Sequence, residues 1–510
     1  EHLHETSDDW QGLSKTDQAK MFVIGHDHFN KSLTLDIENK MMLYMTSVPK
    51  VTQINNRREN RQEDYYTADE LESIFSKVWL KLRSFNKDLF PVQSVVEDSA
   101  IFKASPFHQL TTQQEKARED ILDHVIAAVN ENKRGQLILV EGEAGSGKTV
   151  LLSTLFYQLS QLESNIASPN LDKLKNYLIV NHDEQLKVYQ DIANKLGINK
   201  NDKDVVSKPT RFINQHKVTD KADVVLIDEA HLLWTQGKQS YRGKNQLEDI
   251  MDRAKIVIAV FDPKQVLKTE EYIGSDSINR MRNKASKQGN LIQLTNQMRI
   301  DASAETIQWI RDIVDNRIVE KIPEDKKYDL KIFDNANEMY QAIKEKSKDQ
   351  ERGLSRVVAT FDWEFNGAHG PENADYWMVE AGGLSLPWNL QLPVAKGAGK
   401  KIKNLPWAEQ PQTIGEIGST YTVQGFDLNY CGLIIGPSVK YRNGRIIFDA
   451  SESHNTNAIR KRTMDNGDKK HVYDELLPNE LNVLMTRGVH GLYVYAVDDQ
   501  LRNALMKASK

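Results

Sequence analysis

The sequence predicts an α/β fold with two consecutive parallel-sheet units and a small α+β domain in front of them. From residue 110 onward, short apolar runs rich in β-branched residues alternate with helical patterns, which is typical of buried parallel strands. The 510 residues also exceed what one hydrophobic core usually organises. The strand-like runs form two sets with a break near residue 288, so we expect domains at 1–95, 96–288 and 289–510.

Individual elements follow from local patterns. The expected strands are 136–141, 177–180, 223–228, 255–261, 356–360, 432–435 and 491–497. An aromatic-aliphatic helical pattern runs from Leu71 to Leu82, and the polar stretch from Pro91 to Pro106 is typical of a linker. Residues 361–412 are rich in Gly, Pro, Trp and Asn without a clear period, which predicts an irregular insertion.

Charge and cysteine content exclude several classes of protein. Lys plus Arg (67) against Asp plus Glu (72) gives a net charge of -5, which excludes a histone-like polycation but not a local basic groove. The single cysteine, Cys431, excludes a disulfide framework or a Cys-based zinc cluster and fits a reducing cytosol. Since no apolar run approaches membrane-spanning length, we expect a cytoplasmic protein with no membrane partner. The chain begins at Glu1 without Met, so we expect a longer gene product.

The strongest chemical signal is a glycine-rich loop, Gly142-Glu-Ala-Gly-Ser-Gly-Lys-Thr149, between an expected strand and an expected helix. Its glycines let backbone N–H groups turn toward phosphate oxygens, and the helix N-terminus adds its dipole. We expect Lys148 to contact the β- and γ-phosphates of ATP and Thr149 to ligate Mg²⁺, the alternative being a structural glycine turn. The residues expected to hold the nucleotide here are Gly142, Gly145, Ser146, Gly147, Lys148 and Thr149.

Two further strands end in polar residues. The strand at 223–228 runs into Asp228 and Glu229, at the sheet edge where parallel sheets bind ligands. We expect Asp228 to hold magnesium through water and Glu229 to deprotonate the attacking water, with a helix cap as the alternative. The strand at 255–261 leads to Gln265, which we expect to sense the γ-phosphate unless it only closes a β-turn.

The second unit supplies arginines near strands. Arg299 ends the cluster Leu294-Thr-Asn-Gln-Met-Arg, and Arg487 lies in Val483-Leu-Met-Thr-Arg before the last strand. Arginines that reach a γ-phosphate from a neighbouring domain neutralise charge in the transition state. We expect this role for both residues, although a single arginine is more often a surface ion pair. A third cluster, Thr422-Val-Gln-Gly-Phe-Asp427, precedes a strand.

In this order, the motifs resemble those of superfamily 1 helicases, and most nearly a bacterial family akin to the C-terminal helicase domain of Schlafen proteins. The resemblance covers roughly residues 101–497. It implies two RecA-like domains with ATP and Mg²⁺ in the cleft between them. It also implies that Gln114, or its neighbour Gln113, reads the adenine, and that Gln424 and Gly425 contact the nucleotide.

Residues 25–56 resemble the back half of a GIY-YIG nuclease domain. This resemblance implies that Glu38 binds the catalytic divalent metal and that Asn55, or Asn56, braces the fold. His2 would be the histidine of the family's basic-aromatic motif. No GIY or YIG strand precedes His2 in this sequence, and the alternative is a helical accessory domain.

The resemblances together imply a magnesium-ATP-dependent helicase or translocase on nucleic acid, coupled to a metal-dependent nuclease in bacterial anti-phage defence. We favour DNA over RNA as the partner, although the sequence leaves that choice open. Two basic runs, 396–403 and 460–471, are candidate phosphate contacts, although such runs are more often solvated loops. The alternative is a nucleotide-operated switch or scaffold ATPase that neither separates strands nor cleaves them. A ring ATPase is less favoured, because both arginines lie in the same chain.

Overall fold

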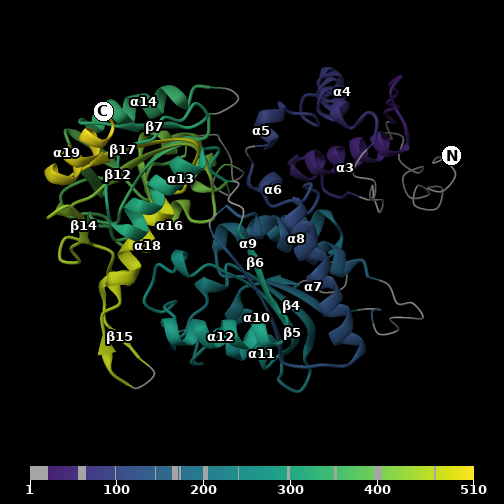
Figure 1. The fold of residues 1–510 in the computed structure, drawn as a ribbon. Coiled ribbons are helices and arrows are strands. Elements are labelled where there is room, and N and C mark those ends of the chain that lie inside the picture. The colour runs from purple at the N-terminus through teal and green to yellow at the C-terminus, as the bar shows by residue number, and fades with distance from the viewer. Residues whose placement is uncertain are drawn as a thin grey trace.

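The computed structural model describes residues 21–510 except 55–64, 98, 144, 163–170, 172–173, 199–204, 239, 296–298, 350–352, 395–401, 403–404 and 465–466. Figure 1 shows two α/β bodies, with an N-terminal helical segment beside them. His2, Asn55, Asn56 and most of the basic run at 396–403 lie outside the described residues.

The first body is built on a six-stranded sheet in which all neighbouring strands are parallel. Its strands, in the order β3-β2-β4-β5-β1-β6, are β3 (Val206–Ser207), β2 (Asn176–Val180), β4 (Ala222–Asp228), β5 (Ala254–Phe261), β1 (Gln136–Gly142) and β6 (Leu291–Leu294). β6 follows residue 288, where we predicted the division between units, and it still pairs with β1. The chain therefore reaches the second sheet only after Leu294.

Helices cover both faces of this sheet, because its strands are apolar on both sides. Val224 and Leu226 belong to one buried cluster and Val225 and Ile227 to the other, as the period-two alternation of a strand requires. The first face carries α7 (Thr112–Asn130), α8 (Lys148–Ser160) and α9 (Asp183–Lys195). The second face carries α10 (Pro209–Gln215), α11 (Gln246–Met251) and α12 (Ser275–Lys287).

The second body contains a five-stranded sheet, also parallel throughout. In the order β11-β8-β12-β17-β7, its strands are β11 (Ile417–Ser419), β8 (Ser355–Ala359), β12 (Leu428–Ile435), β17 (Gly488–Ala496) and β7 (Asp329–Ile332). Its cores are formed with α13 (Ala304–Arg311), α18 (Tyr473–Met485) and α19 (Asp499–Ala508) on one side, and α14 (Ala336–Lys346) on the other. The predicted fold class, two parallel-sheet units, is confirmed.

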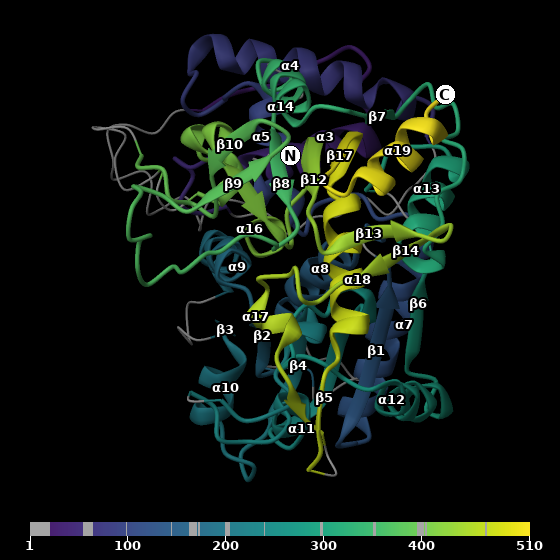
Figure 2. The same ribbon diagram turned by 90° about the vertical axis from the view of Figure 1, so that its left-hand side faces the viewer.

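Shorter elements lie around the sheet of the second body (Figure 2). The predicted insertion at 361–412 is largely irregular but contains a hairpin, β9 (Met378–Ala381) and β10 (Leu384–Pro387), whose Val379 packs with the buried Trp388. Two other hairpins are β13 (Val439–Arg442) with β14 (Arg445–Phe448), and β15 (Arg462–Thr463) with β16 (Lys469–Lys470). The remaining short helices in both bodies are η3 (Ala230–Leu232), η4 (Pro263–Gln265), η5 (Asp312–Asn316), η6 (Trp407–Glu409), η7 (Pro411–Gly415), α16 (Thr420–Val423) and α17 (Thr456–Ile459).

The described part of the N-terminal segment is helical. It contains α3 (Lys31–Ser47), η1 (Ala68–Glu70), α4 (Leu71–Phe85), α5 (Gln93–Glu97) and α6 (Ala100–Lys103). Residues 21–54 and 65–97 contain no strand, so the α+β character expected there has no support in the described residues. The predicted linker from Pro91 to Pro106 is wrong, because α5 and α6 form there and bury Val96 and Phe102.

One buried lysine ties this segment to the first body. The Lys195 ammonium, at the end of α9, donates to the carbonyl oxygens of Thr46 (2.8 Å) and Val48 (3.3 Å) at the C-terminus of α3. Its charge is balanced by Asp191, 3.0 Å away on α9. A cation that satisfies the last carbonyls of a helix also complements the helix dipole. The contact fixes the C-terminus of α3 against α9, which packs on the first face of the sheet together with α8.

Candidate functional site

The glycine-rich loop joins β1 to α8, as the sequence predicts. Gly145 and Gly147 have φ of 86° and 74°, values that favour glycine. A Cβ on Gly145 would lie 2.4 Å from the Cβ of Arg299, so this glycine also permits close approach of the segment that leads to the second sheet. The loop conformation therefore depends on glycine for two separate reasons.

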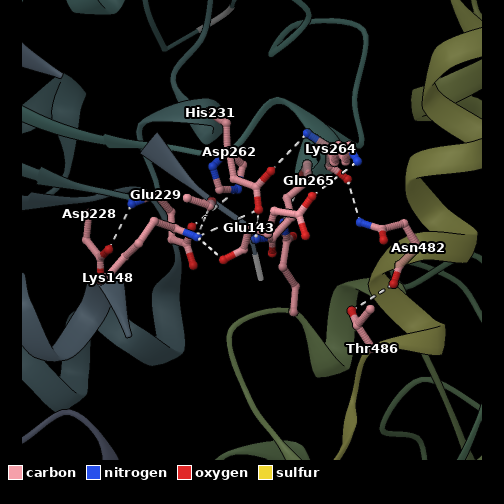
Figure 3. A network of polar contacts seen from close by, with 12 residues as sticks. Glu143, Lys148, Asp228, Glu229, His231, Asp262, Lys264, Gln265, Asn482 and Thr486 are labelled. Atoms are coloured by element: carbon pink, nitrogen blue, oxygen red, sulfur yellow. Dashed lines mark hydrogen bonds and ion pairs between the residues drawn. The ribbon is translucent and has the colours of Figure 1, made fainter. Parts of the chain in front are cut away.

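Lys148, the first residue of α8, is buried with its ammonium turned back into the loop (Figure 3). Nζ donates to the carbonyl oxygens of Gly142 (2.7 Å) and Glu143 (2.8 Å) and lies 3.7 Å from Oδ2 of Asp262. Burial alone would raise the pKa of Asp262, but the charge of Lys148 holds it below its usual value. Lys148 thus places a positive charge, balanced by a carboxylate, inside the loop.

Asp228 and Glu229 follow β4 at the same sheet edge. Asp228 is fully buried and accepts from the Tyr189 hydroxyl (2.6 Å) and from the backbone N–H of Glu229 (3.0 Å). Burial, with the nearby charge of Glu229, raises the pKa of Asp228 to about 7. Glu229 adopts a left-handed backbone with φ of 49°, a strained conformation of the kind that clusters at functional sites.

Gln265 connects the two sheets. Its Nε2 donates to Oδ2 of Asp262 (2.7 Å), and its Oε1 accepts from Nη2 of Arg487 (3.4 Å), the residue just before β17. Gln424 reaches the same residue, since its Nε2 donates to the backbone carbonyl of Gln265 (3.4 Å). Three residues that the sequence places in separate motifs therefore meet at one point.

Arg487 is completely buried. Its guanidinium donates to the carbonyl oxygens of Val483 (2.8 Å) and Phe426 (3.1 Å) as well as to Gln265. Burial, together with the charge of Arg299, lowers its pKa to about 9, so it remains a cation at neutral pH. Arg299 itself forms an ion pair with Asp427, with Nε 2.5 Å from Oδ1.

A cavity joins most of these groups, and its lining fits a nucleoside triphosphate with a divalent cation. Glu229 Oε2 is buried in this cavity without a hydrogen-bond partner in the described structure, and Thr149 lies in the lining beside Lys148. Ser146 Oγ is likewise buried and without such a partner, but Ser146 is not part of the lining. Of the predicted site residues, the lining contains Gly145, Gly147, Lys148, Thr149, Glu229, Gln265, Arg299 and Gly425. The cationic, carboxylate and hydroxyl side chains of the lining are of the types that bind ATP and Mg²⁺.

Gln114 and Gln113 point to different places. Gln114 caps α7 with Thr111, and its Nε2 donates to the carbonyl oxygen of Ser146 in the phosphate loop (3.1 Å). Gln113 instead contacts the end of β6, where its Nε2 lies 3.0 Å from the hydroxyl of Thr295. Of the two, Gln114 touches the phosphate loop, while its reading of adenine stays a prediction.

Glu38 lies away from this cavity. It is exposed on α3, and among the described residues no group of three His, Cys, Asp or Glu side chains is arranged to hold a metal ion. Within the same residues, no helix has the length and apolarity needed to traverse a bilayer. The nuclease expectation therefore gains no support from the described structure.

Sequence reasoning missed a polar clasp around Glu143, the second residue of the glycine-rich loop (Figure 3). Its carboxylate forms ion pairs with Arg311 at the end of α13 and with Lys264 (3.3 Å). Lys264 also pairs with Asp315 (2.8 Å), and its carbonyl oxygen accepts from Asn482 on α18 (3.1 Å). The pattern offered no signal for Glu143 or Arg311, because their pairing depends on the approach of the two bodies.

Other missed groups lie beside predicted ones. Asp262 lies in the same short sequence motif as Gln265, but the motif alone gave it no role. Its contacts with Lys148 and Gln265 show that it balances the charge of Lys148 and positions Gln265. Tyr189, in the middle of α9, gave no signal at all. His231 is fully buried, with Nε2 3.4 Å from Oε2 of Glu229.

The Glu143–Arg311 pair predicts coupling between the loop and the second body. We expect Glu143→Gln and Arg311→Ala each to lower kcat/KM for ATP hydrolysis about fivefold, corresponding to roughly 1 kcal/mol for a partly exposed ion pair. The double variant should fall by less than the product of the two single effects, since both changes remove the Glu143–Arg311 ion pair.

The control for this pair is Arg442→Ala, which breaks the ion pair with Asp498 in the second body. It should leave hydrolysis unchanged. If the effects of Glu143→Gln and Arg311→Ala multiply in the double variant, the two residues do not act through each other.

Comparisons with known proteins place the chain in a family. Among solved structures, the arterivirus non-structural protein 10 helicase matches at 15% identity with a TM-score of 0.30, covering 75% of this chain and 64% of the viral one. The same helicase in a complex with DNA matches at 14% identity with a TM-score of 0.31, covering 76% and 66%. The chain thus spans less than two thirds of the first viral helicase, and TM-scores this low add nothing to the assignment.

One relative is much more similar to this chain in sequence than the viral helicases are. The uncharacterized protein YPL245W of Saccharomyces cerevisiae is 32% identical over 464 residues, which cover 84% of this chain and 97% of the yeast protein. Residues 135–498, which include every motif from the glycine-rich loop to Arg487, match the model of the Schlafen group 3 DNA/RNA helicase domain. The chain belongs to the Schlafen group 3 helicase-domain family.

Proposed function

We propose that this chain is a magnesium-dependent ATPase that drives a helicase or translocase action on nucleic acid. The single observation that supports it most is the contact of Gln265 with Asp262 on one side and Arg487 on the other, beside the Lys148 loop. A group that touches both bodies at the phosphate loop can relay the state of the nucleotide to their relative position. Membership of a DNA/RNA helicase-domain family favours nucleic acid as the partner on which this coupled movement acts.

The protein groups have distinct roles in the proposed reaction. Lys148, released from the carbonyl oxygens of Gly142 and Glu143, neutralises the transferred phosphoryl group. Glu229, whose Oε2 lacks a hydrogen-bond partner in the described structure, accepts the proton of the attacking water. Thr149 and Asp228 would hold Mg²⁺, which would supply positive charge that stabilises the phosphate oxygens.

The second body contributes positive charge. Arg487 contacts Gln265, which lines the cavity, and Arg299 lines the same cavity as Lys148. Both cations come from the same chain, so the proposal needs no arginine from a second subunit. This arrangement differs from that of a ring ATPase, in which a neighbouring subunit supplies the arginine.

The first prediction of this proposal concerns Glu229. We expect Glu229→Gln to keep nucleotide affinity and to slow hydrolysis by roughly a hundredfold, because the positioned base is lost. Lys148→Ala should instead weaken nucleotide binding. Steady-state ATP hydrolysis and binding of a fluorescent ATP analogue measure the two effects, with Glu338→Gln on the exposed face of α14 as a matched control. Hydrolysis by Glu229→Gln at the parental rate would show that the base is assigned wrongly.

A second prediction separates transition-state charge from ordinary binding. Arg299→Ala and Arg487→Ala should depress kcat more than ATP affinity. Since Arg487 is wholly buried, Arg487→Lys is included, which keeps the charge but loses the planar donor pair, and circular dichroism checks each fold. Loss of affinity alone in folded variants of both residues would point to ground-state contacts.

The class of nucleic acid is part of the same proposal. We expect DNA rather than RNA to stimulate hydrolysis, while the matched family is described for both. Hydrolysis measured with single-stranded DNA, duplex DNA and RNA distinguishes them. A nucleotide-operated switch or scaffold is the second candidate, and it predicts stimulation without strand separation or movement along the strand.

A nuclease in the N-terminal segment, and with it a role in anti-phage defence, remains a separate proposal based on the resemblance around Glu38. We expect the protein to cut nucleic acid with Mg²⁺ or Mn²⁺, and Glu38→Ala to abolish cutting while ATP hydrolysis survives. Glu72→Ala, on the neighbouring helix α4, is the control. Cleavage that persists in Glu38→Ala would leave the segment as a helical accessory domain.

A further inference from the structure

A large cavity, which shares no lining residue with the one at the phosphate loop, lies over the second face of the first sheet. Its volume is about 1390 Å³. Apolar side chains of the sheet, and of residues in or next to α11 and α12, form its floor: Leu139 and Phe261 are buried in the sheet, while Ile273 and Met281 are partly exposed. The volume exceeds the roughly 300–1,000 Å³ typical of small-molecule pockets. The space therefore suits part of an extended polymer better than one small ligand.

The β15–β16 hairpin forms one wall of this cavity, although it belongs to the C-terminal half of the chain. Arg462, Thr463 and Met464 line the space opposite α12. Figure 1 shows the hairpin extending from the second body down beside the first. The cavity is thus bounded by both halves of the chain, as the nucleotide cavity is.

Buried polar contacts fix the base of the hairpin to the first body. The guanidinium of Arg462 donates to the carbonyl oxygens of Thr269 (2.6 Å) and Thr235 (3.2 Å) and lies 5.6 Å from the ring centre of Tyr272. Arg460 forms an ion pair with the buried Glu270. These contacts hold the base of the hairpin, so its position over the cavity is set by the fold.

Positive charge without an ion-pair partner among the described residues lies at this cavity and on the hairpin. Lys244 and Lys284 are exposed members of the lining. Lys469 and Lys470 are exposed on β16, whose partner strand contributes Arg462 and Thr463 to the lining, and Lys461 is exposed just before β15. Arg280 adds a further cation at the rim, while Glu248 and Asp276 are acidic members of the lining. Elsewhere on the surface many lysines are paired, for example Lys50 with Asp88 and Lys440 with Asp449. Unpaired cations on both sides of a cavity attract an extended anion.

We propose that this cavity, lined by the hairpin, binds a single-stranded nucleic acid, with the lysines on its phosphates and the apolar floor accepting bases. Sequence-tolerant single-strand sites combine a cationic groove with apolar or aromatic surfaces for the bases. An acidic peptide would use the lysines but gain little from the apolar floor, whose partly exposed members are Met251, Ile273 and Met281. The inference rests on the proposed function, and it locates the strand on the far side of the first sheet from α7 and α8.

The test uses Lys469→Ala with Lys470→Ala, since both lysines are exposed and neither touches the nucleotide cavity. The matched control is Lys326→Ala with Lys327→Ala, another exposed pair, located before β7 and away from the hairpin. Fluorescence anisotropy with a labelled 20-mer of dT, and with the same length of rU, measures affinity over a series of salt concentrations. Hydrolysis of ATP without nucleic acid is measured in parallel.

We expect the hairpin variant to bind the strand at least tenfold more weakly. The slope of log K against log salt should fall by about 1.4, because two phosphates of the strand are no longer neutralised by lysine. The control should bind as the parent does, and basal hydrolysis should stay unchanged in both.

If the hairpin variant binds the strand with the affinity and salt slope of the parent, the inference about this cavity is overturned, while the proposed function is not. A parent that hydrolyses ATP but binds neither strand would overturn the proposed function as well. Equal competition by polyglutamate of matched length would make this an acidic-peptide site and overturn the inference.

Discussion

The burial of Arg487 is the constraint on which the arrangement of the two bodies depends. A fully buried guanidinium is costly unless its donors are satisfied, and here its partners come from three places: Val483 on the preceding helix α18, Phe426 before β12, and Gln265 after β5 of the first sheet. Separation of the bodies would remove Gln265 and leave one donor without a partner. The cation therefore links the satisfaction of its own hydrogen bonds to closure of the cleft.

The nucleotide site follows the same logic on the first sheet. Parallel strands bring their carboxyl ends to one edge, so the residues after β1, β4 and β5 converge without any long-range sequence signal. Lys148 and Asp262 balance each other there, and Gln265 carries the contact onward to Arg487. The Glu143 clasp adds a second, more exposed link between the same bodies. Chemistry at the loop and the position of the second body are thus physically connected.

Strands and motifs were predictable because each depends on local pattern. The run at 223–228 is apolar on both faces, and the glycines of the loop have conformations that few other residues adopt. Contacts between distant segments were not predictable, as Tyr189 with Asp228 and Arg311 with Glu143 illustrate. The prediction of a linker from Pro91 to Pro106 was wrong for a related reason. The few apolar side chains of this stretch show no helical period in the sequence, and they become buried only by packing against α3 and α4.

The most direct test of the central claim is a structure of the chain with Mg²⁺, ADP and aluminium fluoride, which together mimic phosphoryl transfer. The account predicts nucleotide in the cavity between the two bodies, with Lys148 moved from the Gly142 and Glu143 carbonyl oxygens onto fluoride or phosphate oxygens. It also predicts Arg487 in contact with the fluoride and Glu229 with the attacking water. Nucleotide bound elsewhere, or bound here with Arg487 still held only by Val483, Phe426 and Gln265, would contradict it.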